Sequence, residues 1–490
     1  MATFALPLAG WWMNQPILLW SAFVPAIALA LIAPSRLVLG IAVTTPTFPV
    51  LRLANDAVGA GKVSSKGMFL FADDPLILAL AIAWLLTRLR YPGDKKRLYP
   101  SALFGLAMLY PVVILLNAFR LESNQVLVSG LYYLKWLQYG CLLVLVPQTL
   151  RGPARARLAG QYLRIVCGVS LAAAAFGAFE LFESVRNGTY NKAASFPRVS
   201  SFFGSLDPTL YGASEDPVNF GVWAVVMGSL VMAAIAAGAR SNGLFRFSAL
   251  LAAGFSLLAS VSRAPVIAAI AAYSRIQRLN STRLILPATA TCAVTLTAYV
   301  AAPDLVERTA SRFAVIADWG GGKESSAESR LDIALHSPVF EVDQYWLTGH
   351  GHSTYRFVAE QHLARVHNGL SRSLYSFPLT AWYDAGPLGL ALWVLLFRQL
   401  GSRLRSIRDS SEHGETAALA RGLCAALWAL AAASLFGEVP YNWRVMGSFY
   451  LGVAICLAAD EGSRQGIARL RLRHRAAPPS VLVRPREFVS

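Results

Sequence analysis

The feature that most constrains this chain is a series of apolar runs that recurs from one end of the sequence to the other. Most runs are roughly 17 to 25 residues long, which is what a helix needs to cross ~30 Å of hydrocarbon at about 1.5 Å per residue. Hydrophobic residues make up 55% of the 490 residues and charged residues only 14%, which argues against a set of soluble domains. The sequence therefore predicts an all-α polytopic membrane protein.

The apolar runs predict about 12 membrane-spanning helices, or 13 if the short run at 37–50 also crosses. The predicted spans are 17–33, 37–50, 68–89, 101–118, 126–146, 163–180, 218–237, 244–261, 264–274, 285–302, 377–397, 417–436 and 445–459. The predicted parts of the chain are N-terminal helices at 1–302, a large and partly helical loop at 303–375, C-terminal helices at 376–460 and a basic tail at 461–490.

The distribution of charge orients these helices. The net charge of +17 comes from 44 Lys and Arg against 27 Asp and Glu, a balance that would suggest nucleic acid as the partner of a soluble protein. Here the excess lies in short loops at alternate ends of the apolar runs and in the tail, and the positive-inside rule places those loops in the cytoplasm. The large loop is nearly balanced in charge and is therefore expected on the outer face, the periplasm of a Gram-negative cell. We expect membrane lipid and no nucleic acid as a partner.

The cysteines indicate neither disulfides nor a metal centre. All five lie inside apolar runs, away from the loops where an oxidising compartment could pair them. No Cys/His set has the spacing of metal ligands, and no metal or cofactor is expected. Asp73-Asp74-Pro75, which opens one span, is interpreted as a helix N-cap followed by proline, with a functional pair of carboxylates as the alternative.

The large loop is the expected seat of chemistry, because five of the seven histidines lie in it and imidazole is suited to moving protons near neutral pH. These histidines are His336, His350, His352, His362 and His367. His367 is the candidate base. A structural role for it remains the alternative, and His350 and His352, which flank Gly351, compete with it.

Arg263 is the second informative position. It follows Ser262 at the outer end of one apolar run and precedes Pro265 at the start of the next, and a charge at that depth is costly unless it is paired or faces a cavity. Snorkelling to lipid headgroups is the alternative. Together, Arg263 and Arg330 could hold a diphosphate while His367 accepts a proton from an attacking hydroxyl. The residues alone support an outer-face site for a phosphorylated lipid.

The same residues resemble the O-antigen ligase and polysaccharide polymerase superfamily. The resemblance rests on four places in order along the chain. They are the outer loop from Arg198 to Asn219, the pair Ser262-Arg263, the Arg330 segment followed by Gly349-His350-Gly351, and His367-Asn368 followed by Asp384-Ala385-Gly386-Pro387-Leu388-Gly389.

The resemblance implies an inner-membrane glycosyltransferase that works at the periplasmic face without a metal and inverts the configuration of the transferred sugar. Its donor would be a glycan on undecaprenyl diphosphate, held by Arg263 and Arg330, and His367 would activate the acceptor hydroxyl. Arg198 and Asn368 are the further candidates for binding substrate, although Arg198 could equally be an interfacial side chain. Asp384 stands where the family more often has glutamate, and this departure and the long Arg-rich tail leave the subfamily open.

Two acceptors fit such an enzyme. A ligase passes the glycan to the lipid A core, whereas a polymerase passes it to the next lipid-linked repeat unit. The region around His367-Asn368 favours the ligase. A transporter or flippase is the competing class, but such proteins carry charged sites near the bilayer midplane, and the middle of the predicted spans is nearly free of charge. A structural scaffold would not need the clustered histidines or Arg263.

Overall fold

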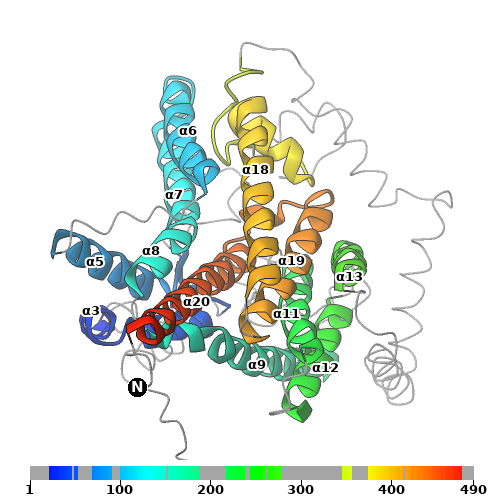
Figure 1. Ribbon diagram of the computed structural model, residues 1–490. Helices are drawn as coiled ribbons and strands as arrows, with labels where there is room; N and C mark the ends of the chain where they lie inside the picture. The colour runs from blue at the N-terminus through cyan, green and yellow to red at the C-terminus, as the bar shows by residue number, and fades with distance from the viewer. Residues whose placement is uncertain are drawn as a thin grey trace, which may run out of the picture.

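The computed structural model describes residues 21–46, 49–52, 69–90, 100–150, 153–186, 217–237, 243–260, 262–276, 345–355, 374–411 and 414–476 (Figure 1). In the first half of the chain the elements are α3 Phe23–Ile32, α4 Pro34–Thr44, β1 Pro49–Arg52, β2 Phe69–Phe71, α5 Asp74–Arg90, α6 Ser101–Asn117, α7 Ser123–Gly140, α8 Leu142–Thr149, η1 Pro153–Arg157 and α9 Leu158–Arg186. In the second half they are α11 Pro217–Ala236, α12 Gly243–Ala259, α13 Arg263–Ile276, α18 Phe377–Ser410, α19 Gly414–Ser434, η5 Val439–Tyr441 and α20 Trp443–Ala476.

The described chain is helical apart from one short antiparallel pair, in which β1 and β2 join. Five of its helices are long and apolar enough to cross a membrane, which makes this a membrane-embedded helical protein. These segments are Arg155–Glu180, Pro217–Ala236, Phe377–Ser410, Gly414–Ser434 and Trp443–Ser463. The helical class is thus confirmed, whereas the predicted count of 12 spans is not.

Several predicted spans differ from the helices that form. The short run at 37–50 yields α4, whose 11 residues extend only ~16 Å, and the chain then enters β1, so this piece is too short to cross. The run at 126–146 is divided between α7 and α8, with the break at Cys141 directly after Gly140. The last helix passes the predicted boundary at 460 and continues to Ala476. The predicted span at 285–302 lies outside the described residues.

The helix ends follow local sequence rules. Pro217 begins α11 and Pro34 begins α4, since proline fits the first turn of a helix, where its missing N–H group would lack a partner anyway. At the start of α7, Glu122 and Gln125 form a reciprocal capping box with each other's backbone N–H groups. These local signals explain why most helix boundaries lie within a few residues of the predicted spans.

The long helices pack around α19. It contacts α11, α13 and α18, and it approaches α11 so closely that a Cβ atom on Gly422 would lie 2.8 Å from the Cα atom of Leu230. In Figure 1, α18 runs down the middle of the view, with α6 and α7 on one side and α11, α12 and α13 on the other. On the other side of the bundle, α20 contacts α7, α8, α9 and η1. The described cysteines, which are all free, are Cys141, Cys167, Cys424 and Cys456.

Candidate functional site

The structure describes one of the predicted site residues, Arg263. Arg198, Arg330, His367 and Asn368 lie outside the described residues, so their predicted meeting with Arg263 stays a prediction. Two further parts of the chain carry candidate chemistry. They are the loop at 345–355 and a buried group of charged side chains around the start of α5.

Arg263 is the first residue of α13, at the reversal that connects α12 to α13. The side chain is half-buried, and the preceding Ser262 is buried and donates a hydrogen bond to the Ser260 carbonyl at 3.0 Å. Among the described residues, no hydrogen bond or ion pair involves its guanidinium group. A cation in the first turn is unfavourable, because the helix dipole places positive charge there. The local arrangement therefore favours a bound anion beside Arg263.

A second helix begins next to this position. A Cβ atom on Gly221, in the second turn of α11, would lie 2.5 Å from Ser260 Oγ and 2.6 Å from Pro265 Cγ, so α11 and the start of α13 are in direct contact. Neither helix has an acidic residue in its first turn. The start of α13 with Arg263 therefore lies beside the first turns of α11, and helix N-termini and arginine commonly bind phosphate or carboxylate; Glu215 and Asp216 directly precede α11 in the sequence.

This place lies at the same end of the bundle as the loop at 345–355. Trp223, near the start of α11, donates a hydrogen bond to Ser448, near the start of α20, at 3.2 Å. The chain enters α20 from η5, in which the Tyr441 ring lies 5.0 Å from the His352 ring. The starts of α11, α13 and α20 and the loop therefore share one end, which the prediction from charge assigns to the outer face.

The loop is fixed to α18 by a buried histidine and carboxylate. His352 Nδ1 lies 2.9 Å from Asp384 Oδ2, and the Ser353 N–H group donates to Asp384 Oδ1 at 3.1 Å. Both side chains are almost fully buried, with 2% and 0% of their surface exposed. The Gly351 N–H group also donates to the Asp384 carbonyl, at 3.1 Å. In this conformation His352 is enclosed by protein and holds the loop against α18.

Two glycines permit this contact. Gly386 interrupts α18 with a φ of 66°, and a Cβ atom there would lie 2.0 Å from the Leu347 carbonyl oxygen. Gly349 has a φ of 79°, and a Cβ atom there would lie 2.5 Å from Ala385. Only glycine adopts such angles without strain and leaves room for a second backbone. Two of the four segments that carry the family resemblance, Gly349-His350-Gly351 and Asp384 to Gly389, therefore contact each other directly.

Aromatic side chains surround the pair of His352 and Asp384. The Tyr110 ring lies 4.6 Å from the His352 ring, and the Tyr110 hydroxyl is 2.9 Å from the Tyr441 hydroxyl. Trp393 Nε1 donates to the Tyr110 oxygen at 2.8 Å. This interior joins α6, α18, the loop and η5, so the position of the loop is tied to the packing of three separate parts of the chain.

His350 occupies a different environment. Its ring stacks on Tyr383 with 4.4 Å between ring centroids and 6° between the planes, and it remains half-buried. Nearby, the exposed Arg120 places its guanidinium carbon 3.5 Å from the centroid of the Tyr345 ring and donates to Asn117 Oδ1 at 3.0 Å. His350 is thus the described loop histidine that has some access to solvent.

A buried cluster of charges was missed by sequence reasoning. Lys135, in the middle of α7, forms an ion pair with Asp74 at the start of α5, and Gln138 donates to the same carboxylate oxygen at 2.8 Å. Asp73 Oδ1 lies 3.2 Å from the Tyr139 hydroxyl oxygen, and Asp73 Oδ2 lies 3.1 Å from the Thr45 hydroxyl oxygen. The middle of the predicted spans is therefore not free of charge. Lys135 within the run at 126–146 was the signal, and the carboxylate that pairs with it is 61 residues away in the sequence.

The two aspartates also differ from the predicted N-cap. The Asp73 carbonyl accepts the Ile77 N–H group at 2.9 Å, as the residue before a helix does. Its side chain, however, reaches across to α4 and α7, and the Asp74 side chain accepts the Phe71 N–H group at 2.8 Å. Both carboxylates serve contacts between elements, because burial leaves no water to solvate them.

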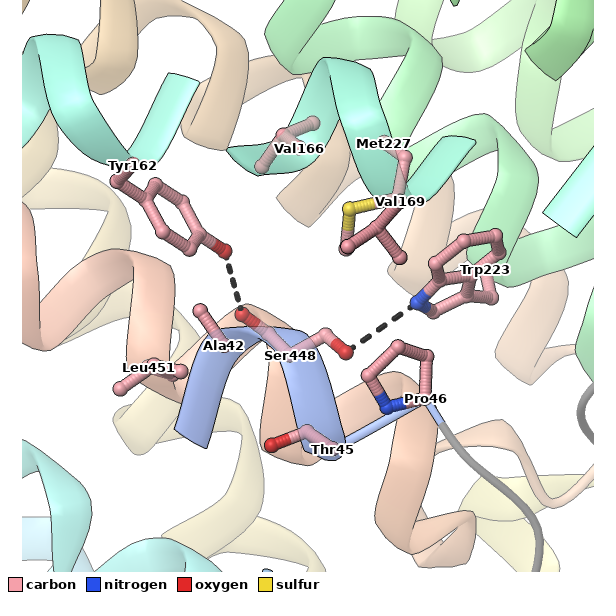
Figure 2. Close-up of a pocket in the computed structure, with 10 residues that line it drawn as sticks. All are labelled: Ala42, Thr45, Pro46, Tyr162, Val166, Val169, Trp223, Met227, Ser448 and Leu451. Carbon is pink, nitrogen blue, oxygen red and sulfur yellow. Dashed lines mark hydrogen bonds between the residues drawn. The ribbon is translucent and has the colours of Figure 1, made fainter. Parts of the chain in front are cut away.

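A small pocket opens between α4, α9, α11 and α20 (Figure 2). Its lining is mostly apolar. The Tyr162 hydroxyl donates a hydrogen bond to the Ser448 carbonyl, and Trp223 Nε1 donates one to the Ser448 hydroxyl. The polar groups that Figure 2 shows around Ser448 are thus already satisfied by one another. No predicted site residue lines this pocket, and in the described part of the chain no group of three His, Cys, Asp or Glu side chains could hold a metal ion.

A comparison with models of known protein families finds no match, and a comparison with curated protein sequences finds none either. The fold and the described residues define a class, a membrane-embedded helical protein with a candidate anion site where α11 and α13 begin.

Proposed function

We propose that the protein is a glycosyltransferase that moves a glycan from a polyprenyl diphosphate to an acceptor hydroxyl at the outer surface of the membrane. The observation that carries this proposal is Arg263, half-buried at the meeting N-termini of α11 and α13 and without a described anionic partner. A diphosphate supplies the negative charge that this arrangement favours, and it is the leaving group of such a transfer.

The proposed reaction needs groups that stabilise the leaving diphosphate, a base that accepts the proton of the hydroxyl, and groups that hold the sugars. The oxygen of the acceptor hydroxyl attacks the anomeric carbon, the bond from that carbon to the phosphate oxygen breaks, and the diphosphate departs with the bonding electrons. Arg263 and Arg330 would stabilise the charge that gathers on the diphosphate, and His367 would take the proton of the hydroxyl. Arg198 and Asn368 are the candidates for holding the sugars. Attack from the face opposite the diphosphate would invert the anomeric centre.

The finer assignment follows the family resemblance. We place the protein in the bacterial inner membrane with its site on the periplasmic side, with undecaprenyl diphosphate as the lipid of the donor. The acceptor is the lipid A core in an O-antigen ligase and a lipid-linked repeat unit in a polymerase, and we propose the ligase first. The contact between Gly349-His350-Gly351 and the Asp384 segment supports the resemblance, because it brings together two segments that the resemblance singles out.

The test is a glycan analysis of cells that lack the gene and carry Arg263→Ala, Arg330→Ala or His367→Ala, with the amount of protein in membranes measured by blot. Removing one arginine from a leaving diphosphate should slow transfer about 100- to 1,000-fold. The matched control is Arg275→Ala, since Arg275 lies in the same helix but 3.9 Å from the Trp428 ring instead of at the helix start. Long lipid-linked glycan should accumulate for a ligase, and single repeat units for a polymerase.

Normal glycan from all three variants, at normal protein levels, would refute the assignment. A translocation function then moves ahead, and the buried ion pair of Asp74 and Lys135 favours it as the second candidate. Charged groups inside a helical membrane bundle commonly mark the path of an ion or a substrate. Purified protein in liposomes separates the two functions, because a flippase moves lipid-linked glycan between leaflets without changing its covalent structure.

A further inference from the structure

Asp73 and Asp74 are neighbours in the chain, but they have different partners. Asp74 accepts hydrogen bonds from a lysine ammonium, an amide and a backbone N–H group, which together suit a carboxylate that carries its charge. Asp73 is fully buried, with 0% of its surface exposed, and the hydrogen-bond partners of its side chain among the described residues are two hydroxyl groups, those of Thr45 and Tyr139. Hydroxyl groups are neutral, and each can accept a hydrogen bond as well as donate one.

The Thr45 hydroxyl shows where a proton is needed. Its oxygen lies 2.8 Å from the Ile41 carbonyl oxygen and 3.1 Å from Asp73 Oδ2, and both are acceptors when Asp73 is ionised. A hydroxyl has a single hydrogen, so it can donate to only one of them. The shorter distance assigns that hydrogen to Ile41. The contact between Thr45 and Asp73 then becomes a hydrogen bond only if the hydrogen comes from Asp73.

We propose that Asp73 is a proton-binding site of the folded protein, which holds a proton on Oδ2 and donates it to Thr45, and that release of this proton loosens the junction of α4 with α5 and α7. In the protonated form every hydrogen has one acceptor. Asp73 donates to Thr45, Thr45 donates to Ile41, and Tyr139 donates to Asp73 Oδ1.

Burial and the charge of Asp74 favour the protonated form of Asp73, whereas the charge of Lys135 favours the ionised form. Lys135 on α7 is already paired with Asp74 on α5, so this ion pair is balanced without Asp73. Arg444 on α20 lies nearby, 4.9 Å from the Phe71 ring, and α4 brings only the uncharged Thr45 to this carboxyl group. Burial, and then the charge of Asp74, raise the pKa of Asp73 from 3.8 to about 6, although Lys135 and the hydrogen bond donated by Tyr139 oppose the shift. Asp73 lies in the turn before α5, outside the five segments long enough to cross the membrane.

The sign of the pH dependence follows. A carboxyl group whose pKa is higher in the folded state binds its proton more tightly in that state. Its contribution to stability is therefore complete below the pKa of the unfolded state. The contribution is lost as the pH rises through the pKa of the folded state. A shift of two pH units corresponds to about a 100-fold change in the unfolding equilibrium constant. The protein should therefore become less stable between about pH 4 and pH 7 through this group.

The experiment is thermal unfolding of the purified full-length protein in lipid nanodiscs over this pH range. Asp73→Asn keeps the size of the protonated acid and can donate its amide hydrogen to Thr45. Its unfolding temperature at acid pH should therefore match that of the wild type, and it should not fall at higher pH. Asp73→Ala should be less stable at every pH. The surface control is Asp409→Asn, whose side chain is 63% exposed, and it should behave as the wild type does. The proposal is overturned if Asp73→Asn at acid pH is as unstable as Asp73→Ala.

A variant of the partner provides an independent test. Thr45→Val removes the acceptor of the proposed proton, so the midpoint of the pH dependence should move to lower pH, and Thr45→Ser should restore it. If Asp73 is instead ionised and accepts from Thr45, the same valine variant removes a donor from the carboxylate, and the midpoint moves to higher pH. A move to higher pH therefore overturns the proposal.

Discussion

Replacing Asp384 should release the loop at 345–355 from α18. The Asp384→Ala variant removes the acceptor of both the buried His352 Nδ1 and the half-buried Ser353 N–H group. Hydrogen bonds to a charged group contribute about 1.5 to 3 kcal/mol each, and removal of one member of a buried pair typically costs about 3 to 5 kcal/mol. We expect a loss in that range. Asp384→Asn keeps one carbonyl acceptor and should lose about half as much.

Hydrogen exchange and thermal unfolding of the purified protein measure this effect. Peptides covering 345–355 should exchange faster in Asp384→Ala than in the wild type, whereas peptides of α11 and α19 should change less, since no hydrogen bond joins the carboxylate to either helix among the described residues. Asp384→Glu adds a methylene to a fully enclosed site and should cost about 1 to 3 kcal/mol through overpacking, even though glutamate preserves the charge. Exposed Asp409→Ala serves as the control. Unchanged loop exchange and an unchanged unfolding temperature in Asp384→Ala would show that this pair does not hold the loop.

Two further pairs of substitutions test a close backbone contact and the buried ion pair. Gly386→Ala places a methyl group 2.0 Å from the Leu347 carbonyl oxygen at a φ of 66° and should destabilise the protein by about 2 to 4 kcal/mol. Gly254→Ala, inside α12, meets no atom within 4 Å and should stabilise the protein by about 0.5 to 1 kcal/mol. Equal unfolding temperatures for the two variants would contradict the close contact at Gly386. Lys135→Met leaves the Asp74 carboxylate without its cation and should lower the free energy of unfolding, measured with a chemical denaturant, by about 3 to 5 kcal/mol. Adding Asp74→Asn should recover part of this loss. A double variant no more stable than Lys135→Met would argue against direct coupling of the two side chains.

The positions of most helices could be predicted from the sequence, because they depend on contiguous apolar residues and on local end signals. The run at 101–118 corresponds to α6 Ser101–Asn117, and the run at 218–237 corresponds to α11 Pro217–Ala236. The errors occur where tertiary contacts decide the outcome. The run at 126–146 predicts one span, yet the helix breaks beside Gly140, where a Cβ atom would lie 3.1 Å from Leu103.

The candidate site could be predicted only in part. Arg263 was found from its place between two apolar runs, since the cost of burying a charge depends on the local sequence around it. The approach of Gly221 to Ser260 and Pro265 was not found, because these residues are 39 and 44 positions further along the chain. The role of His352 was also missed. Its sequence neighbours suggested a rival base, whereas Asp384, 32 residues further along, encloses it.

By itself the sequence determined the class of this protein, since long apolar helices with few charges must lie in a membrane, and it determined that polar and basic residues gather at the helix ends. The tertiary structure decided which of those residues meet. It brought the N-termini of α11 and α13 together beside Arg263, enclosed His352 with Asp384, and paired Lys135 with Asp74. The physical reason is that burial in a membrane depends on composition over about 20 consecutive residues, whereas a pair of charges or a close backbone contact depends on the positions of two atoms from distant parts of the chain.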